Sequence, residues 1–280
     1  MRFKFDVSIY LTGIFLAGFL FVQLFNQQIA LAEITTAPST SEIVNQVKQN
    51  DLDVIYLGEN HDSSAIHQQQ LEIITQLQQN IAGSEQELAI ALEMFQRPFQ
   101  PILDRYIAGT ISEAELRKQT EYDTRWGFDW EFYAPTIRFA RERQIPLIAL
   151  NTPAEITQKV AESGINSLEG SDFRYIPPLK EIKLDSVEYR QRLADIYQQH
   201  VEAGQGNSTD ANNFFAAQVL WDETMAEAIA LYHQQHGQAQ IIVLVGKAHI
   251  MFDDAIPERV ARRTNQPSIS QKSFLLANNP

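Results

Sequence analysis

The hydrophobic positions along the chain predict alternating β-strands and α-helices. Four apolar runs have the length and the aliphatic, often β-branched content of buried strands: residues 54–57, 88–92, 145–150 and 241–245. Apolar residues at helical spacing follow the first run, from Ile66 to Ile81. A last strand is predicted at residues 270–276. This alternation predicts an α/β fold, with a mostly parallel sheet and helices on both of its faces.

Capping signals mark the ends of several predicted helices. Ser112 and Glu115 form the capping box of one helix. Thr152 is the predicted N-cap of another, with Glu155 completing its box and Gly164 at its end. The long helical stretch between the second and fourth strands predicts a helical cap over one edge of the sheet.

The first residues have the features of a targeting segment. Two basic residues precede a continuous apolar stretch at residues 9–25, and Ala30-Leu31-Ala32 supplies the small residues of a cleavage site. We therefore expect residues 1–32 to be a signal peptide, and residues 33–280 to form one exported domain in the periplasm or at the cell surface. The alternative is an uncleaved leader that anchors the protein in a membrane through residues 9–25.

Composition and charge remove several classes of function. The chain has 35 Asp and Glu residues against 22 Lys and Arg, and it has no block of basic residues. Nucleic-acid binding depends on clustered basic side chains, so no nucleic-acid partner is expected. The chain also contains no cysteine, which excludes disulfides, thiolate metal ligands and a lipid-modified cysteine.

The tetrapeptide G-x-x-H occurs twice, each time directly after a predicted strand. The two copies are Gly58-Glu59-Asn60-His61 and Gly246-Lys247-Ala248-His249. We expect each glycine to release the backbone into a sharp turn. The carboxyl ends of parallel strands meet at one edge of a sheet, where ligands collect. His61 and His249 are therefore predicted to share a site.

Further polar side chains are predicted at the same edge. Glu93 follows the second strand, and Asn151 follows the third. Imidazole and carboxylate suit a borderline or hard divalent cation, so His61, Glu93 and His249 are candidate metal ligands, with Glu59 as a further catalytic candidate. A remaining carboxylate can act as general base toward metal-bound water.

Two other interpretations of these residues stay open. Without a metal, a histidine paired with a carboxylate could perform direct acid–base chemistry, as in esterase-type hydrolysis. Alternatively, each histidine only bonds a neighbouring carbonyl, and each glycine only serves its turn. Lys247 places a positive charge beside His249, which should lower the pKa of that imidazole.

An aromatic segment, residues 126–133, is the other unusual feature of the chain. It could line a flat apolar cofactor, with Tyr133 offering a phenolate to ferric iron. Trp126 and Tyr133 also follow helical spacing, however, which is typical of an ordinary core stripe. His67 faces either the site or the solvent. Arg97 and Arg125 could pair with carboxylates of a ligand or of the protein itself.

Several strings, spread over nearly the whole predicted mature chain, carry a family resemblance. They are Leu57 to Asp62 with His67, Glu93-Met94-Phe95, Gln100 with Leu103-Asp104 and Tyr106 to Gly109, Trp126 to Pro135, Ile148 to Pro153, Gln218 with Trp221 to Ala226, and Gly246 to His249. In this order they resemble the ChaN-type haem-binding proteins, which share a superfamily with the Tiki and TraB proteins and, more remotely, with erythromycin-esterase-like enzymes.

The resemblance implies an exported protein that binds haem in iron acquisition, and a homodimer is compatible with it. The predicted haem-contacting residues are His67, Arg97, Trp126, Tyr133 and Asn151. Tiki-like relatives use paired G-x-x-H motifs and a glutamate for metal-dependent hydrolysis, which implicates His61, His249 and Glu93. The chain departs from surface lipoproteins of the family because it has no cysteine to acylate. It also carries Lys247 where family members commonly have a small neutral residue.

Haem or iron binding is therefore the first predicted function. Hydrolysis that depends on a divalent metal is the second, and a scaffold with a vestigial site is the third. The order of the first two rests on the resemblance, because the residues alone favour the hydrolase.

Overall fold

The computed structural model describes residues 37–184, 186–202, 210–237, 239–251, 255–264 and 269–277. The predicted signal peptide and the alternative anchor at residues 9–25 lie outside these residues. No helix within the described part of the chain combines the length and the apolar content that crossing a bilayer requires.

The centre of the molecule is a five-stranded parallel sheet in the order β3-β2-β4-β1-β5. Its strands are β1 (Val54–Glu59), β2 (Glu87–Gln96), β3 (Leu147–Asn151), β4 (Ala239–Gly246) and β5 (Gln271–Leu275). The predicted α/β class and parallel sheet are confirmed. The four internal apolar runs became strands that are buried along almost their whole length, as is typical of a parallel sheet covered on both sides.

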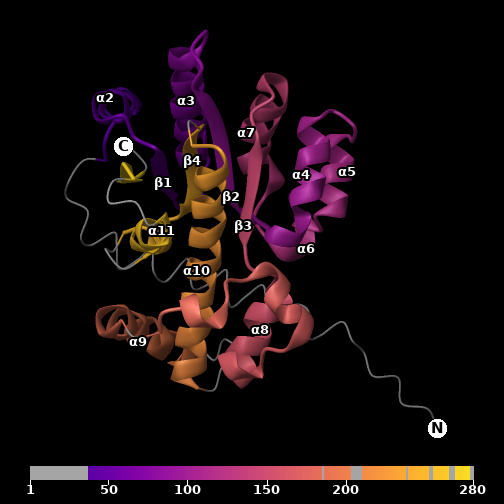
Figure 1. The fold of residues 1–280 in the computed structure, drawn as a ribbon, viewed down its shortest axis with the longest axis vertical. Helices are drawn as coiled ribbons and strands as arrows, with labels where there is room; N and C mark the ends of the chain where they lie inside the picture. Colours follow the sequence, from indigo (N-terminus) through magenta and orange to yellow (C-terminus); the bar gives the residue numbers. More distant parts are fainter. Residues whose placement is uncertain are drawn as a thin grey trace.

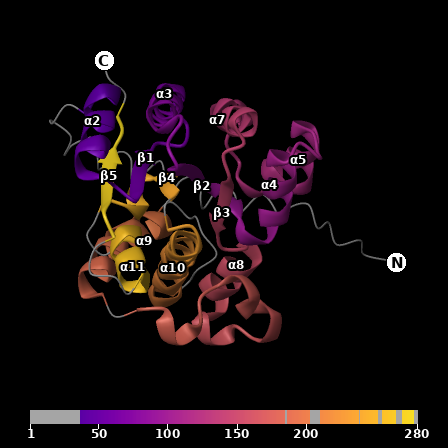
Figure 2. The same cartoon turned by 45° about the horizontal axis from the view of Figure 1, so that its top comes forward.

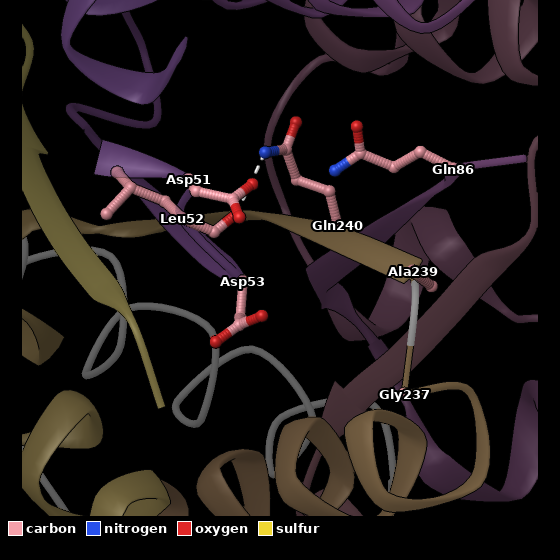
Figure 3. A pocket seen from close by; sticks show the side chains of 7 residues that line it. All are labelled: Asp51, Leu52, Asp53, Gln86, Gly237, Ala239 and Gln240. Carbon is pink, nitrogen blue, oxygen red and sulfur yellow. Dashed lines mark hydrogen bonds between the residues drawn. The ribbon is translucent and has the colours of Figure 1, made fainter. Parts of the chain in front are cut away.

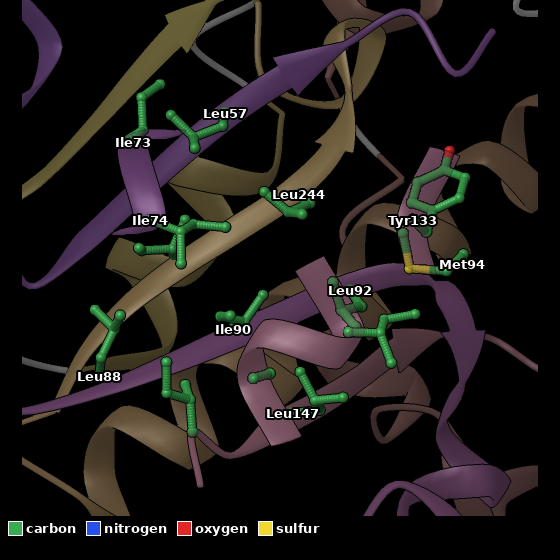
Figure 4. Packing of buried hydrophobic residues seen from close by; sticks show 14 of the residues in the cluster. Leu57, Ile73, Ile74, Leu88, Ile90, Leu92, Met94, Tyr133, Leu147 and Leu244 are labelled. Atoms are coloured by element: carbon green, nitrogen blue, oxygen red, sulfur yellow. The ribbon is translucent and has the colours of Figure 1, made fainter. Parts of the chain in front are cut away.

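Helices cover both faces of this sheet (Figures 1 and 2). One face carries α2 (Thr40–Asn50), α3 (Ser64–Ile81) and α7 (Trp130–Arg143), and the other carries α10 (Ala211–Gln235) and α11 (Ile256–Thr264). Two clusters of buried apolar side chains fill the space between the layers, one on each face. Figure 4 shows the first cluster, in which Ile90, Leu92 and Leu244 of the sheet pack with Ile73 and Ile74 of α3.

The remaining helices lie between the second and fourth strands, as predicted for a cap. The helices α4 (Gln100–Ile107), α5 (Glu113–Gln119) and α6 (Tyr122–Arg125) lie beside the edge strand β3 (Figures 1 and 2). Beyond β3 follow α8 (Ala154–Ser163), three short 3₁₀ turns and α9 (Val187–Glu202). This second group packs on the far end of α10 around its own apolar cluster.

One predicted cap is confirmed and the other is wrong. The side chain of Ser112 accepts from the backbone N–H of Glu115, whose carboxylate in turn accepts from the N–H of Ser112. The second helix begins later than predicted, at Ala154 with Pro153 as N-cap, although it does end at Gly164. The Thr152 hydroxyl donates to the carbonyl of Leu220 on α10, 3.5 Å away. It therefore does not cap the helix.

The central pair of strands determines where the two G-x-x-H segments lie. β1 and β4 are direct neighbours, with Val54 opposite Ile241 and Glu59 opposite Gly246. Both segments therefore leave the sheet side by side at its carboxyl edge. The shared edge that we predicted for the two histidines is present.

The predicted reason for the two glycines is wrong. Gly58 lies inside β1, Gly246 ends β4 with φ of −57°, and neither adopts the left-handed conformation of a glycine turn. Both glycines allow close approach instead. A Cβ on Gly58 would lie 2.8 Å from Cδ1 of Ile250, and a Cβ on Gly246 would lie 2.9 Å from Nε2 of His61. Each motif thus keeps one neighbouring segment in contact with the strand end.

Replacing Gly58 with alanine should destabilise the fold. The added methyl would force Ile250 and its neighbours to shift, and overpacking of this kind typically costs about 1–3 kcal/mol. We expect chemical denaturation to show a lower free energy of unfolding for Gly58→Ala. Gly237→Ala is the control, because the nearest atom to its Cβ would be 3.9 Å away. Equal stability of the two variants would contradict the close-approach explanation.

Candidate functional site

The carboxyl edge of the sheet brings two histidines together around one glutamate. Nε2 of His61 lies 3.9 Å from Oε2 of Glu93, and Nε2 of His249 lies 3.5 Å from Oε1 of the same carboxylate. All three side chains are buried, with 2%, 6% and 8% of the surface of His61, Glu93 and His249 exposed. The predicted convergence of these residues on one site is therefore present.

Glu93 owes its place to the end of strand pairing. β2 pairs with β4 as far as Leu92, and its register with β3 shifts between Leu92 and Gln96. The Glu93 side chain turns toward β4 there, and its Oε2 accepts a 2.6 Å hydrogen bond from the backbone N–H of Gly246. The glutamate thus lies against the end of β4, with an imidazole near each of its oxygens.

Glu59 holds the first imidazole. Nδ1 of His61 lies 2.8 Å from Oε1 of Glu59, while Tyr133 and Gln70 donate hydrogen bonds to the same carboxylate, each at 2.7 Å. Burial would raise the pKa of Glu59, but the nearby His67 and the hydrogen bond and charge of His61 outweigh it and lower the pKa to about 2. Glu59 is therefore ionised at neutral pH.

The charge state of His61 follows from its two carboxylate neighbours. Burial alone would lower the pKa of this imidazole, but the charge of Glu93 and the hydrogen bond to Glu59 raise it above its usual value. The anionic Glu59 keeps a proton on Nδ1, which leaves Nε2 as the nitrogen that faces Glu93.

Asp222 of α10 holds the second imidazole. Nδ1 of His249 lies 2.5 Å from Oδ1 of Asp222, and Oδ2 of Asp222 accepts a 2.6 Å hydrogen bond from the hydroxyl of Tyr189 on α9. Burial would lower the pKa of His249, but the charges of Asp222 and Glu93 raise it to about 9. The expectation that Lys247 would lower this pKa is wrong, because the two adjacent carboxylates dominate.

His67 lies behind the first imidazole and does not face the solvent. It is 5% exposed, its Nε2 lies 3.0 Å from the backbone oxygen of His61, and its Nδ1 lies 3.2 Å from the side-chain oxygen of Gln70. Its ring also stacks on Phe132, with centroids 5.4 Å apart. His67 therefore supports the backbone of the G-x-x-H segment.

Aromatic side chains surround the two imidazoles. The ring centroid of His61 is 4.8 Å from that of Trp126 and 4.9 Å from that of Phe128, while Trp221 lies 6.5 Å from His249. These three aromatic residues are only partly buried. Trp126 therefore lies beside His61, while Tyr133 is part of the core, as expected of a core stripe. The interpretation that the segment lines a cofactor stays a prediction.

Tyr133 is committed to hydrogen bonding in this structure. It is 2% exposed, and its hydroxyl donates to Glu59. Burial and the charge of Glu59 raise its pKa well above the usual value, which disfavours the phenolate that would bind ferric iron. The arrangement favours a role for Tyr133 in holding Glu59.

The other predicted ligand contacts lie at the same edge but bond to the protein itself. Asn151 donates to the backbone oxygen of Glu93 at 3.0 Å. Arg97 forms an ion pair with Glu227. Arg125 forms ion pairs with Glu121 and Glu155 at 2.8 and 2.7 Å and donates to Gln96 at 2.9 Å.

The three predicted metal ligands lie close together, but their arrangement is not that of a metal site. Within the described residues, no group of three or more His, Asp or Glu side chains is arranged to hold a metal ion. The structure therefore gives no support for a metal at His61, Glu93 and His249.

Sequence reasoning missed Asp222, Tyr189 and Gln70 as parts of the site. Asp222 lies inside a long helix with almost no hydrophobic periodicity, since α10 is buried on most of its circumference. The sequence did offer one signal: two adjacent acidic residues, Asp222 and Glu223, in a mostly apolar helix. Buried carboxylates require partners, so this pair indicates a polar contact inside the protein.

A polar pocket of about 250 Å³ lies at the opposite end of the sheet (Figure 3). Its lining comes from residues that precede or begin strands: Asp51, Leu52, Asp53, Gln86, Gly237, Ala239 and Gln240. Gln240 donates to the backbone oxygen of Leu52 at 2.8 Å, and Asp53 accepts from the N–H of Ser270 at the same distance. The pocket brings together no imidazole and bonds two of its polar side chains to the protein itself, so the imidazole cluster is the stronger candidate site.

Comparison with known proteins places the chain among relatives of similar fold. The family model described as "Haem-binding uptake, Tiki superfamily, ChaN" matches residues 43–260. The solved structure described as "Cofacial heme binding to ChaN of Campylobacter jejuni" is 19% identical, with a TM-score of 0.62, and the match covers 81% of this chain and 82% of that one. At this identity the likeness shows the fold alone.

A plant protein is also similar in sequence. RETICULATA-RELATED 5, chloroplastic, of Arabidopsis thaliana is 26% identical over 238 residues, which is 80% of this chain and 31% of the plant protein. The chain therefore spans about a third of the length of that relative.

The raised pKa of His249 makes stability depend on pH. The folded-state pKa of about 9 lies above the unfolded value of about 6.5, so the stabilisation is complete below pH 6.5 and is lost as pH rises through 9. We expect urea denaturation of the ligand-free protein to show this loss. His249→Gln should show a smaller decline over the same range, whereas His236→Gln, at an exposed position, should behave as wild type. Identical profiles for His249→Gln and wild type would contradict the assignment.

Proposed function

This chain belongs to the ChaN family of haem-binding uptake proteins in the Tiki superfamily, and from that membership we propose that it binds haem and serves haem or iron uptake. The observation that carries the proposal is the pair of imidazoles beside partly exposed aromatic rings at the carboxyl edge of the sheet. We place the haem against this edge.

The residues present match haem in chemical kind. Trp126, Phe128 and Trp221 offer apolar ring surfaces to a porphyrin. Imidazole is a common haem iron ligand, and His249 is the more exposed of the two at 8%. When bound, haem would supply an iron centre whose chemistry depends on this ligand.

The charged groups at the edge suit the polar margin of the same ligand. Haem carries two propionates, which pair with guanidinium groups. Arg125 directly precedes Trp126, and Arg97 follows the last residue of β2. Each now pairs with a glutamate of the protein. Binding of a propionate would exchange one carboxylate partner for another.

Export is part of the same proposal. The apolar leader with its A-x-A cleavage site supports transport out of the cytoplasm, to the periplasm or the cell surface. Haem binds cofacially to the Campylobacter ChaN protein, which motivates a homodimer here, because a haem plane has two faces to cover.

A hydrolase of the Tiki type is the second candidate. Its support is the pair of imidazoles around Glu93, each bonded to a further carboxylate. Imidazole and carboxylate are the general acids and bases that hydrolysis uses. The described residues do not form a metal site as they stand. The hydrolase proposal therefore has less structural support than haem binding.

Titration with haemin tests the first proposal. Haemin added to the protein from residue 33 onward should produce a saturable shift of the Soret band. His249→Ala should weaken binding by roughly tenfold or more, because loss of a residue that only orients a metal ligand already costs about 10–100-fold. Tyr133→Phe distinguishes ligation from positioning, since loss of an iron ligand changes the spectrum of the complex. His236→Ala is the matched control for an exposed histidine.

A flat haemin titration would refute the proposal outright. Saturable binding that His249→Ala and His61→Ala leave unchanged would retain haem binding but move it away from this edge. Binding abolished by Tyr133→Phe with loss of the ligand-to-iron bands would restore Tyr133 as the ligand.

Metal analysis tests the second candidate. Protein purified without an affinity tag should contain a stoichiometric divalent metal if the hydrolase proposal holds, and His61→Ala should lose it. A wild type without metal, or a metal content that His61→Ala leaves unchanged, would remove metal-dependent hydrolysis from consideration.

A further inference from the structure

We infer that Asp222 is the positioning residue of His249, and that Tyr189 in turn fixes Asp222. The inference rests on the proposed function in one respect, namely that the ligand binds at the His249 imidazole. The supporting contacts are a 2.5 Å separation between Nδ1 of His249 and Oδ1 of Asp222, and a 2.6 Å hydrogen bond from Tyr189 to Oδ2.

The arrangement repeats the one at the first imidazole with residues from other elements. His61 has a carboxylate at Nδ1, and that carboxylate also accepts a tyrosine hydroxyl. His249 also has a carboxylate at Nδ1 that accepts a tyrosine hydroxyl, but here the carboxylate comes from α10 and the tyrosine from α9. In both cases Nε2 is directed to Glu93. The same arrangement at two unrelated places in the sequence indicates a shared requirement for ring orientation.

The requirement is a chemical one. An imidazole bound to a carboxylate through Nδ1 keeps a proton on that nitrogen, so Nε2 is the nitrogen that gives up its proton and binds a ligand. A carboxylate at this position also fixes the ring plane and increases the basicity of the ligating nitrogen. Asp222 therefore decides which nitrogen of His249 is offered at the site.

Asp222 can do this because its own position is strongly constrained. It is fully buried on α10, and the next residue, Glu223, is fully buried as well. Glu223 accepts hydrogen bonds from three arginines of α11: Arg259, Arg262 and Arg263. These ion pairs fix α10 against α11 and leave Asp222 to bond with Tyr189 and His249.

Tyr189 is constrained in the same way. Its ring lies 5.8 Å from that of Phe215, and the guanidinium carbon of Arg259 lies 5.3 Å from its centroid. The hydroxyl is therefore held beside Asp222, where it satisfies the carboxylate oxygen that His249 does not use. This contact joins α9, in the helical cap, to the site at the sheet edge.

Nuclear magnetic resonance of protein labelled with ¹⁵N-histidine tests the positioning directly. The chain has six histidines, so the Nδ1–H resonances can be assigned by substitution. Without any ligand, wild-type protein should show a slowly exchanging, downfield Nδ1–H proton from His61 and another from His249. Asp222→Asn should shift the His249 resonance upfield and speed its exchange, because an amide is a weaker acceptor than a carboxylate.

The His61 resonance in the same spectrum is the internal control. It should remain in place in Asp222→Asn, whereas Glu59→Gln should move it and leave that of His249 unchanged. Tyr189→Phe should weaken protection at His249 to a smaller degree. Tyr197→Phe on the same helix and Glu72→Gln at an exposed carboxylate should leave both resonances as in wild type.

Three outcomes would overturn the inference. The first is a wild type without a protected Nδ1–H at His249. The second is an Asp222→Asn variant whose His249 resonance does not move. If that variant fails to fold by circular dichroism, an unchanged His249 signal in Tyr189→Phe is the third.

Haemin affinity separates this inference from the proposed function. Asp222→Asn should raise the haemin dissociation constant by about 10–100-fold, the usual effect of losing a partner of a metal-ligating histidine. If wild type fails to bind haemin but shows the expected resonances, haem binding fails and the positioning stands. If haemin binds equally well to Asp222→Asn, the positioning has no role in ligand binding.

Discussion

The pairing of β1 with β4 is the interaction on which the site depends. The register sets Glu59 opposite Gly246, so that the two G-x-x-H segments leave the sheet from adjacent positions. Gly246 has no side chain, and His61 therefore approaches the backbone closely enough for both imidazoles to reach Glu93. A shift of this register would move the two histidines apart even if the surrounding helices kept their positions.

Around this pair the protein places a large amount of buried charge. Glu59, Glu93, Asp222 and Glu223 are all nearly inaccessible, and burial of an unpaired carboxylate is expensive. Each is satisfied by partners from at least two elements, such as Tyr133 and Gln70 at Glu59. Natural sequences accept such networks where a particular geometry is needed, which supports a functional role for the edge.

Much of the fold could be predicted from the sequence, because a buried parallel strand is a local signal. The apolar runs at residues 54–57 and 241–245 are sufficient to predict two strands. The residues that come directly after them are then predicted at the carboxyl edge of the sheet. The convergence of His61, Glu93 and His249 was predictable for the same reason. The role of the glycines was not, because close approach depends on which segment packs opposite, and that is a property of the tertiary structure.

The second carboxylate was missed for a related physical reason. Asp222 lies on a helix that is buried nearly all round, so no polar face marks it, and its partners come from residues distant in sequence. The predicted direction of the shift in the His249 pKa was wrong. Lys247 is its neighbour in sequence, but Asp222 and Glu93 are its neighbours in space. Local pattern predicts elements well, but electrostatics depends on contacts between them.

The strand order has a consequence for how the protein is made. The two central strands come from opposite ends of the described chain, so the first histidine emerges from the ribosome long before the second one and its aspartate. Until β4 inserts between β1 and β2, the two imidazoles cannot meet at Glu93, so this edge of the sheet stays incomplete during most of the synthesis of the described residues. The imidazole cluster therefore forms only after β4, the fourth of the five strands in chain order, has been made.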